Sequence, residues 1–240
     1  MAKKTDSNLY TILFSIGMVI IVGSLLAGFA SSTREMRENN DKVKAQIDIL
    51  SSIGVDADRS NATQKFTENI KEQYVIEGTT ATENPEAYLV DVKKEQAKAK
   101  KGETQRLPLF IAEKEGKKVY IIPVRGAGLW DAIWGYIALK DDLQTIDGVF
   151  FDHKGETPGL GANITQSFFT DDFKGEKIYD QKGNYAAVAV SKSNGDPSNN
   201  DKEDNEVDAI GGATITGNGV AAMLKSGIKV YLPYFETLKK

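Results

Sequence analysis

The chain has 240 residues, 30 Lys and Arg against 34 Asp and Glu, a formal net charge of −4, one histidine and no cysteine. A chain without cysteine cannot form thiol nucleophiles, disulfides, iron–sulfur clusters or thiolate zinc sites, and one histidine cannot build a multi-histidine metal site. The acidic excess argues against a nucleic-acid partner, because nothing neutralises the phosphate charge. The length leaves room for one large domain or two small ones.

The N-terminal segment predicts a transmembrane anchor. Residues 7–33 contain no charged side chain, and residues 9–30 are nearly all apolar. As a helix these 22 residues span about 33 Å, close to the roughly 30 Å of a bilayer's hydrocarbon core. A cleaved signal peptide is the alternative, because Lys3 and Lys4 precede the run. Its apolar core is typically about 7–15 residues, shorter than this run. Basic residues on both sides of the helix leave its orientation open.

The region after the anchor is polar. Val43, Ile47 and Leu50 have the i, i+4, i+7 spacing of a helix. Residues 56–105 are rich in charge and poor in large apolar side chains, so we expect helices and loops on a solvated face. The chain is therefore expected to divide into an N-terminal segment with the anchor (1–33), a polar, helical connecting region (34–105) and a compact domain (106–240).

The last part of the chain predicts an α+β domain with an antiparallel sheet and flanking helices. Turn signals at 115–118 and 181–184 each lie between apolar runs and predict two hairpins. Residues 219–229 have helical spacing, and residues 193–204 have the composition of a surface loop. The expected strands are 107–112, 119–124, 136–139, 149–152, 177–180 and 185–190.

Two glycine-rich stretches are candidates for ligand binding. The first runs from His153 to Gly161 and follows a predicted strand; its glycines and Pro158 form a tight loop whose N–H groups can face a ligand. The second runs from Asp208 to Thr216 and precedes the last long predicted helix, whose N-terminus favours a phosphate. Each is also compatible with an ordinary turn. The Walker and G-x-G-x-x-G patterns are absent, so free nucleotide binding is not indicated.

A third stretch, residues 125–136, carries both tryptophans beside three glycines. Either Trp130 or Trp134 can lie against a flat ring, although core packing is the more common role of a tryptophan. Together and in this order, the three stretches resemble the FMN-binding domain family. Within it they are most similar to the C subunits of sodium-translocating NADH:quinone oxidoreductases, with the paralogous G subunits of related electron-transport complexes as the alternative.

The resemblance implies FMN joined through its phosphate to a threonine of the motif D-x-x-[S/T]-G-A-T, installed by a separate flavin transferase. Thr214 is then the acceptor and Thr216 the fallback, while Gly211 replaces the usual Ser or Thr. The resemblance further implies contacts from the rest of this motif and from the two upstream stretches. The residues expected around the flavin are Asp208, Gly212, Ala213, Thr214, Thr216, Trp130, Glu156, Thr157, Leu160 and Gly161.

This resemblance also implies an electron-relaying subunit in the inner membrane, with a periplasmic flavin domain and the other membrane subunits of the complex as partners. A flavin exchanges single electrons, so no catalytic acid–base pair is expected. His153 is expected to pack at a strand end, because it has no partner for a metal site. Two alternatives remain: a flavin-free anchored assembly domain, and a Ser/Thr hydrolase using His153, which no Gly-x-Ser-x-Gly elbow supports.

Overall fold

The computed structural model describes residues 8–193, 195–196 and 199–239. The chain forms two compact units, Met1–Lys42 and Val43–Lys240. The first contains α1 (Asn8–Ser32), which is long and apolar enough to cross a membrane and has no buried residue. The helix expected over residues 9–30 is thus present. A second helix, α2 (Arg34–Ser52), follows, and its last part belongs to the second unit.

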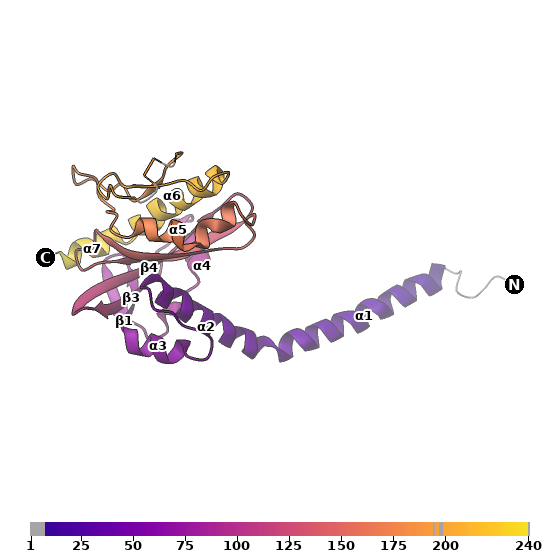
Figure 1. Cartoon of the computed structure of the whole chain (residues 1–240). Helices are drawn as coiled ribbons and strands as arrows, with labels where there is room; N and C mark the ends of the chain where they lie inside the picture. The colour runs from indigo at the N-terminus through magenta and orange to yellow at the C-terminus, as the bar shows by residue number, and fades with distance from the viewer. Residues whose placement is uncertain (1–7, 194, 197–198, 240) are drawn as a thin grey trace. The chain divides into compact units, whose positions relative to one another are not determined.

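The second unit is built on a six-stranded antiparallel sheet with the order β2-β1-β3-β4-β5-β6 (Figure 1). The strands are β1 (Ile70–Glu77), β2 (Thr80–Glu83), β3 (Leu107–Lys114), β4 (Lys117–Ala127), β5 (Ala132–Leu139) and β6 (Ile146–His153). Each neighbour in the series from β3 to β6 follows directly along the chain, so three short connections alternate between the two ends of the sheet. The predicted hairpin at residues 115–118 is confirmed: Glu115 and Gly116 have φ of 54° and 76°, as a two-residue type I′ turn requires.

Both faces of the sheet are covered, which explains why β3 has six consecutive buried residues. On one face Ile122, Val124 and Ile137 pack with α6 (Thr214–Lys229) and α7 (Leu232–Leu238). On the other face Phe110 and Ile121 pack with the end of α2 and with α3 (Ala62–Asn69). The α+β class and the helix expected at 219–229 are confirmed. That helix begins five residues earlier, at Thr214.

Shorter elements complete the unit. They are the helix α4 (Val92–Ala99) and the shorter helical segments η2 (Ala87–Leu89), η3 (Gly161–Thr165), α5 (Ser167–Thr170) and η4 (Asp171–Phe173). A separate pair of two-residue strands, β7 (Ala189–Val190) and β8 (Glu206–Val207), is parallel. The expected loop at 193–204 includes residues 194, 197 and 198, which lie outside the described residues; its described residues form no helix or strand.

Two expectations were wrong. The helices and loops expected over residues 56–105 include two strands, β1 and β2, at one edge of the sheet. The sequence does not show β1 as a strand, because most of its residues are polar or charged. Only three of its eight residues, Ile70, Val75 and Ile76, are buried. The hairpin expected around residues 181–184 is a turn with a single bridge, Tyr179 to Tyr185, and β7 pairs with β8 instead. The three-part division of the chain stays a prediction.

Candidate functional site

Three segments that are distant in the sequence meet at the end of the sheet where β4 is connected to β5. They are the connection from β4 to β5, the loop after β6, and the N-terminus of α6. Between them lies a pocket of about 250 Å³. Its lining residues are Leu129, Glu156, Thr157, Leu160, Gly161, Gly212, Ala213, Thr214, Ile215 and Thr216. Eight of the ten residues expected around a flavin therefore line this pocket.

Glu156 is the residue that joins the three segments. Its side chain is buried, and its Oε1 accepts a hydrogen bond of 2.9 Å from the Trp130 backbone N–H. Its Oε2 accepts one of 3.3 Å from the Leu129 N–H and one of 2.6 Å from the Thr216 hydroxyl. Burial by itself raises the pKa of Glu156, but these hydrogen bonds outweigh it and hold the pKa below its usual value. The carboxylate is therefore ionised at neutral pH and fully used in fixing the site.

Glycines make this close approach feasible. A Cβ on Gly128 would lie 2.6 Å from Glu156 Oε1, and a Cβ on Gly161 would lie 2.5 Å from the Thr216 hydroxyl. Gly212 has φ of +74°, in the left-handed region that glycine adopts without strain. Glycines from all three stretches therefore serve one purpose here, which is to let these segments approach one another without side chains between them.

The two candidate acceptor threonines have different environments. Thr214 is the first residue of α6, is exposed and lines the pocket. Thr216 is buried, and its hydroxyl hydrogen is given to Glu156. The first turn of α6 contains no acidic residue. Its free N–H groups and the helix dipole make the surroundings of Thr214 suitable for an anion.

Large apolar side chains are exposed around the pocket. Leu129, Trp130, Leu160 and Ile215 are 46%, 68%, 40% and 58% exposed. Core packing, the ordinary role of a tryptophan, is thus wrong for Trp130. The indole N–H donates to the Thr157 hydroxyl at 3.1 Å, which ties the ring to the loop after β6. Exposed apolar groups that are held in place at a pocket mark a binding surface.

Asp208 is not among the residues that line the pocket. Its Oδ1 accepts a hydrogen bond of 3.4 Å from the Asp196 N–H, and its buried Oδ2 has no hydrogen-bond partner among the described residues. His153 lies at the end of β6, where its Nδ1 accepts a hydrogen bond from the Glu156 N–H. Within the part of the chain that the structure describes, no cluster of three or more His, Asp or Glu side chains is suited to a metal ion.

Sequence reasoning missed Leu129 and Ile215. Leu129 precedes Trp130 and Ile215 follows Thr214, and both Trp130 and Thr214 were singled out from the sequence. Only their position next to a chemically informative neighbour could have indicated them, because an isolated leucine or isoleucine carries no chemical signal in a sequence.

A family model described as "FMN-binding domain" matches residues 128–229, the part of the chain that contains the whole pocket. The fold and this match place an FMN-binding-type domain within the second unit. Among curated proteins, the C subunit of the Na⁺-translocating NADH-quinone reductase of Neisseria meningitidis serogroup A is 30% identical, with 100% of this chain and 98% of that protein covered. The corresponding protein of Vibrio campbellii is 28% identical over 92% of this chain and 90% of that protein.

Two solved structures agree with these relatives. The C subunit of the same reductase from Parabacteroides distasonis has 36% identity and a TM-score of 0.74, covering 84% of this chain and 96% of that one. NqrC of Shewanella oneidensis has 25% identity and a TM-score of 0.67, covering 83% and 98%. The chain belongs to the family formed by the C subunits of Na⁺-translocating NADH-quinone reductases.

Proposed function

We propose that this chain is the membrane-anchored flavoprotein subunit of a Na⁺-translocating NADH-quinone reductase. FMN is held by a phosphoester to Thr214, and the protein relays electrons between other subunits of the complex. The observation that carries the proposal is that Thr214, the first residue of α6, is exposed and lines the pocket, whereas Thr216 at the same helix end is buried against Glu156.

The residues present fit this cofactor. The N-terminus of α6 offers backbone N–H groups to a phosphate, and Gly212 and Ala213 leave its approach open. The exposed side chains of Leu129, Trp130 and Leu160 provide apolar and aromatic surface for a flat ring system. When bound, FMN supplies one-electron exchange, and the protein supplies position and electrostatic environment.

Each residue then has a definite part. Glu156 positions Trp130 and fixes Thr216, which is buried and therefore less accessible to a phosphate than the exposed Thr214. Thr157 orients the Trp130 ring. No residue of the site has to move a proton, which agrees with the expectation that the chemistry needs no acid–base pair. NADH and quinone are handled by other subunits in this proposal, and a flavin transferase is the partner during maturation.

Covalent attachment is tested by co-expression with a flavin transferase, denaturing electrophoresis and ultraviolet illumination of the gel. We expect a fluorescent wild-type band and a dark band for Thr214→Val, which removes the hydroxyl but keeps the shape. Thr216→Ser is the matched control: it keeps the hydroxyl bound to Glu156, so its band stays fluorescent. A fluorescent Thr214→Val band, or a dark wild-type band, would refute the assignment of Thr214.

The membrane arrangement is tested separately. We propose that α1 stays in the inner membrane and that the flavin domain lies in the periplasm, an arrangement that the family membership supports. The chain has no cysteine, so Lys182→Cys at an exposed turn introduces a single thiol. A membrane-impermeant maleimide added to intact spheroplasts should label this variant. Labelling only after lysis would place the domain in the cytoplasm.

A further inference from the structure

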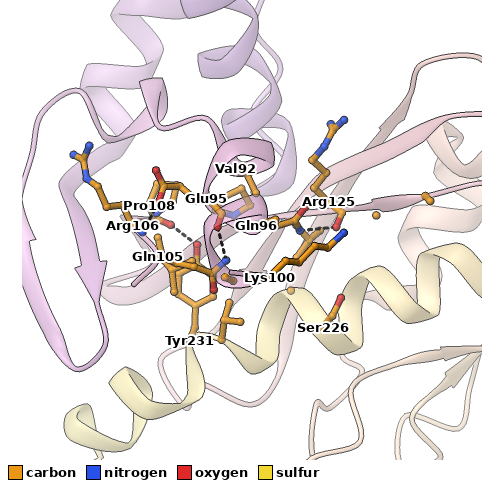
Figure 2. A pocket seen from close by; sticks show the side chains of 18 residues that line it. Val92, Glu95, Gln96, Lys100, Gln105, Arg106, Pro108, Arg125, Ser226 and Tyr231 are labelled. Carbon is orange, nitrogen blue, oxygen red and sulfur yellow. Dashed lines mark hydrogen bonds between the residues drawn. The ribbon is translucent and has the colours of Figure 1, made fainter. Parts of the chain in front are cut away.

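A second and larger pocket, of about 480 Å³, lies where β3 and β4 separate (Figure 2). The β3–β4 ladder ends at the pair Phe110↔Ile121, although both strands continue beyond it. The register explains why. Two residues further along each strand, Pro108 would lie opposite Pro123, and neither proline has an N–H to donate. β3 stays paired with β1 as far as Leu107 while β4 stays paired with β5, and a fork opens between them.

Side chains of α4 replace the missing strand partners in this fork. Gln96 donates its amide N–H to the Arg125 carbonyl at 2.9 Å, and Glu95 accepts the Arg106 backbone N–H at 2.9 Å. On the opposite side, the Tyr231 hydroxyl donates to the Pro108 carbonyl at 2.8 Å. Three of the backbone polar groups at the fork are thus paired with side chains, so the separation of β3 and β4 is a stable feature of the fold and not a frayed sheet edge.

The backbone donor of β4 that points into the fork is the Arg125 N–H, as the hydrogen-bond pattern of the neighbouring residues shows. The Gly128 N–H donates to the Asp131 carbonyl, so Gly128, Gly126 and Val124 are the residues that exchange hydrogen bonds with β5 and the turn before it. Arg125 lies between them, and its N–H and carbonyl must both point to the other side, where Gln96 meets the carbonyl. Figure 2 shows Lys100 next to Gln96 and Arg125, whereas the guanidinium groups of Arg106 and Arg125 point away from the pocket.

Most of the remaining lining is apolar, with Glu95, Gln105, Arg106 and Ser226 as the polar exceptions. Val92 of α4, Leu107 and Pro108 of β3, Val124 of β4, and Val230 and Tyr231 after α6 form the walls. Glu95 is the acidic lining residue, and it is neutralised by Lys98 at 2.8 Å. An apolar pocket of this size with a few convergent polar groups has the properties of a small-molecule site.

We propose that this fork binds a single-chain amphiphile with a terminal carboxylate, such as a free fatty acid. The Arg125 N–H and the Lys100 ammonium receive the carboxylate, and the apolar walls receive the chain. An extended peptide fits less well, because Pro123 has no N–H and the Arg125 carbonyl already has its partner. A diacyl lipid fits less well, because a pocket of about 480 Å³ offers room for one chain and the guanidinium groups of Arg106 and Arg125 point away from it. This site is independent of the proposed flavin attachment, which uses none of these residues.

The test uses the full chain in phosphatidylcholine nanodiscs and a twelve-carbon carboxylate probe that carries a diazirine in its chain. After photolysis, peptide mapping should find the probe on residues 92–108 or 226–231. We expect Ala99→Trp, which fills the pocket, to lower this labelling about tenfold, and Lys100→Gln to lower it about fivefold. Ala97→Trp, at a position of the same helix outside the pocket, is the matched control and keeps wild-type labelling.

Two further arms identify the ligand class. The methyl ester of the same probe, which has lost the carboxylate charge, should label about tenfold less. Anionic phosphatidylglycerol nanodiscs should not reduce labelling; if they do, a lipid headgroup occupies the fork and the proposal fails. Labelling confined to α1, or equal labelling in wild type, Ala99→Trp and Lys100→Gln, would show membrane partition only and would also overturn it. Lys100 is exposed, so Lys100→Gln keeps the test valid if Ala99→Trp does not fold.

Discussion

The assignment of Glu156 as the link between three segments predicts a large effect of a small change, Glu156→Gln. The substitution keeps the shape but replaces one carboxylate oxygen by an NH₂ group. Oε1 faces the Trp130 N–H and Oε2 faces the Leu129 N–H, so either orientation of the amide sets a donor against a backbone donor. Only the Thr216 hydroxyl can rotate to adapt.

The cost follows from the burial of the site. Glu156 is 4% exposed, so a lost hydrogen bond to its charge is worth about 1.5–3 kcal/mol of unfolding free energy. For a unit of this size, each kcal/mol corresponds to roughly 2–4 °C in Tm. We therefore expect Glu156→Gln to lower Tm by about 3–12 °C at pH 7. The matched control Glu113→Gln, at an exposed strand position, should change unfolding by less than about 0.5 kcal/mol.

Tryptophan fluorescence of the full chain in detergent is a suitable assay, because Trp130 is one of only two tryptophans and is bound to Glu156. The effect must also depend on pH. The folded pKa of Glu156 lies below its ordinary value of 4.5, so its stabilisation is complete above about pH 4.5 and is lost as the pH falls through the folded pKa. An equal Tm for wild type and Glu156→Gln at pH 7, or a Tm difference that persists unchanged in acid, would refute the reasoning.

Two other substitutions test the sheet and the loop over it. Gly135→Ala would bring a Cβ within 2.0 Å of the Phe150 carbonyl oxygen and should destabilise by about 2–3 kcal/mol in urea unfolding, whereas Gly155→Ala, with open space around it, should be nearly neutral. Glu176 is buried, and burial raises its pKa to about 7, so the wild type should lose up to about 3 kcal/mol as the pH rises from 4.5 through 7. Glu176→Gln should remove this pH dependence of Tm; a wild type whose stability does not decline over that range contradicts the buried carboxyl.

Much of the fold was predictable because it depends on local patterns. The uncharged run of residues 9–30 predicted a helix that the structure has. The turn residues 115–118 between two apolar runs predicted a hairpin, and the positive φ of Glu115 and Gly116 shows that its turn is of type I′. The edge strand β1 was missed, because three buried residues among eight give no clear alternation, and its pairing with β3 depends on residues more than thirty positions away.

The candidate site was predictable only as a set of residues, not as a geometry. The glycine-rich stretches and Trp130 were singled out from composition and a family resemblance. Nothing in the sequence indicated that Trp130 is exposed, or that Asp208 lies outside the pocket. Exposure depends on what packs over a side chain, and that is decided by the whole sheet and α6.

By itself, the sequence determined the apolar helix, the antiparallel hairpin at residues 115–118, the glycines that permit close backbone approach and the family to which the chain belongs. The tertiary structure decided that Glu156 and Thr216, sixty residues apart, share a hydrogen bond. It also decided that Pro108 and Pro123 come into register and open a fork in the sheet. Helices and turns follow from interactions between near neighbours, whereas burial and strand register are fixed only when distant segments pack against one another.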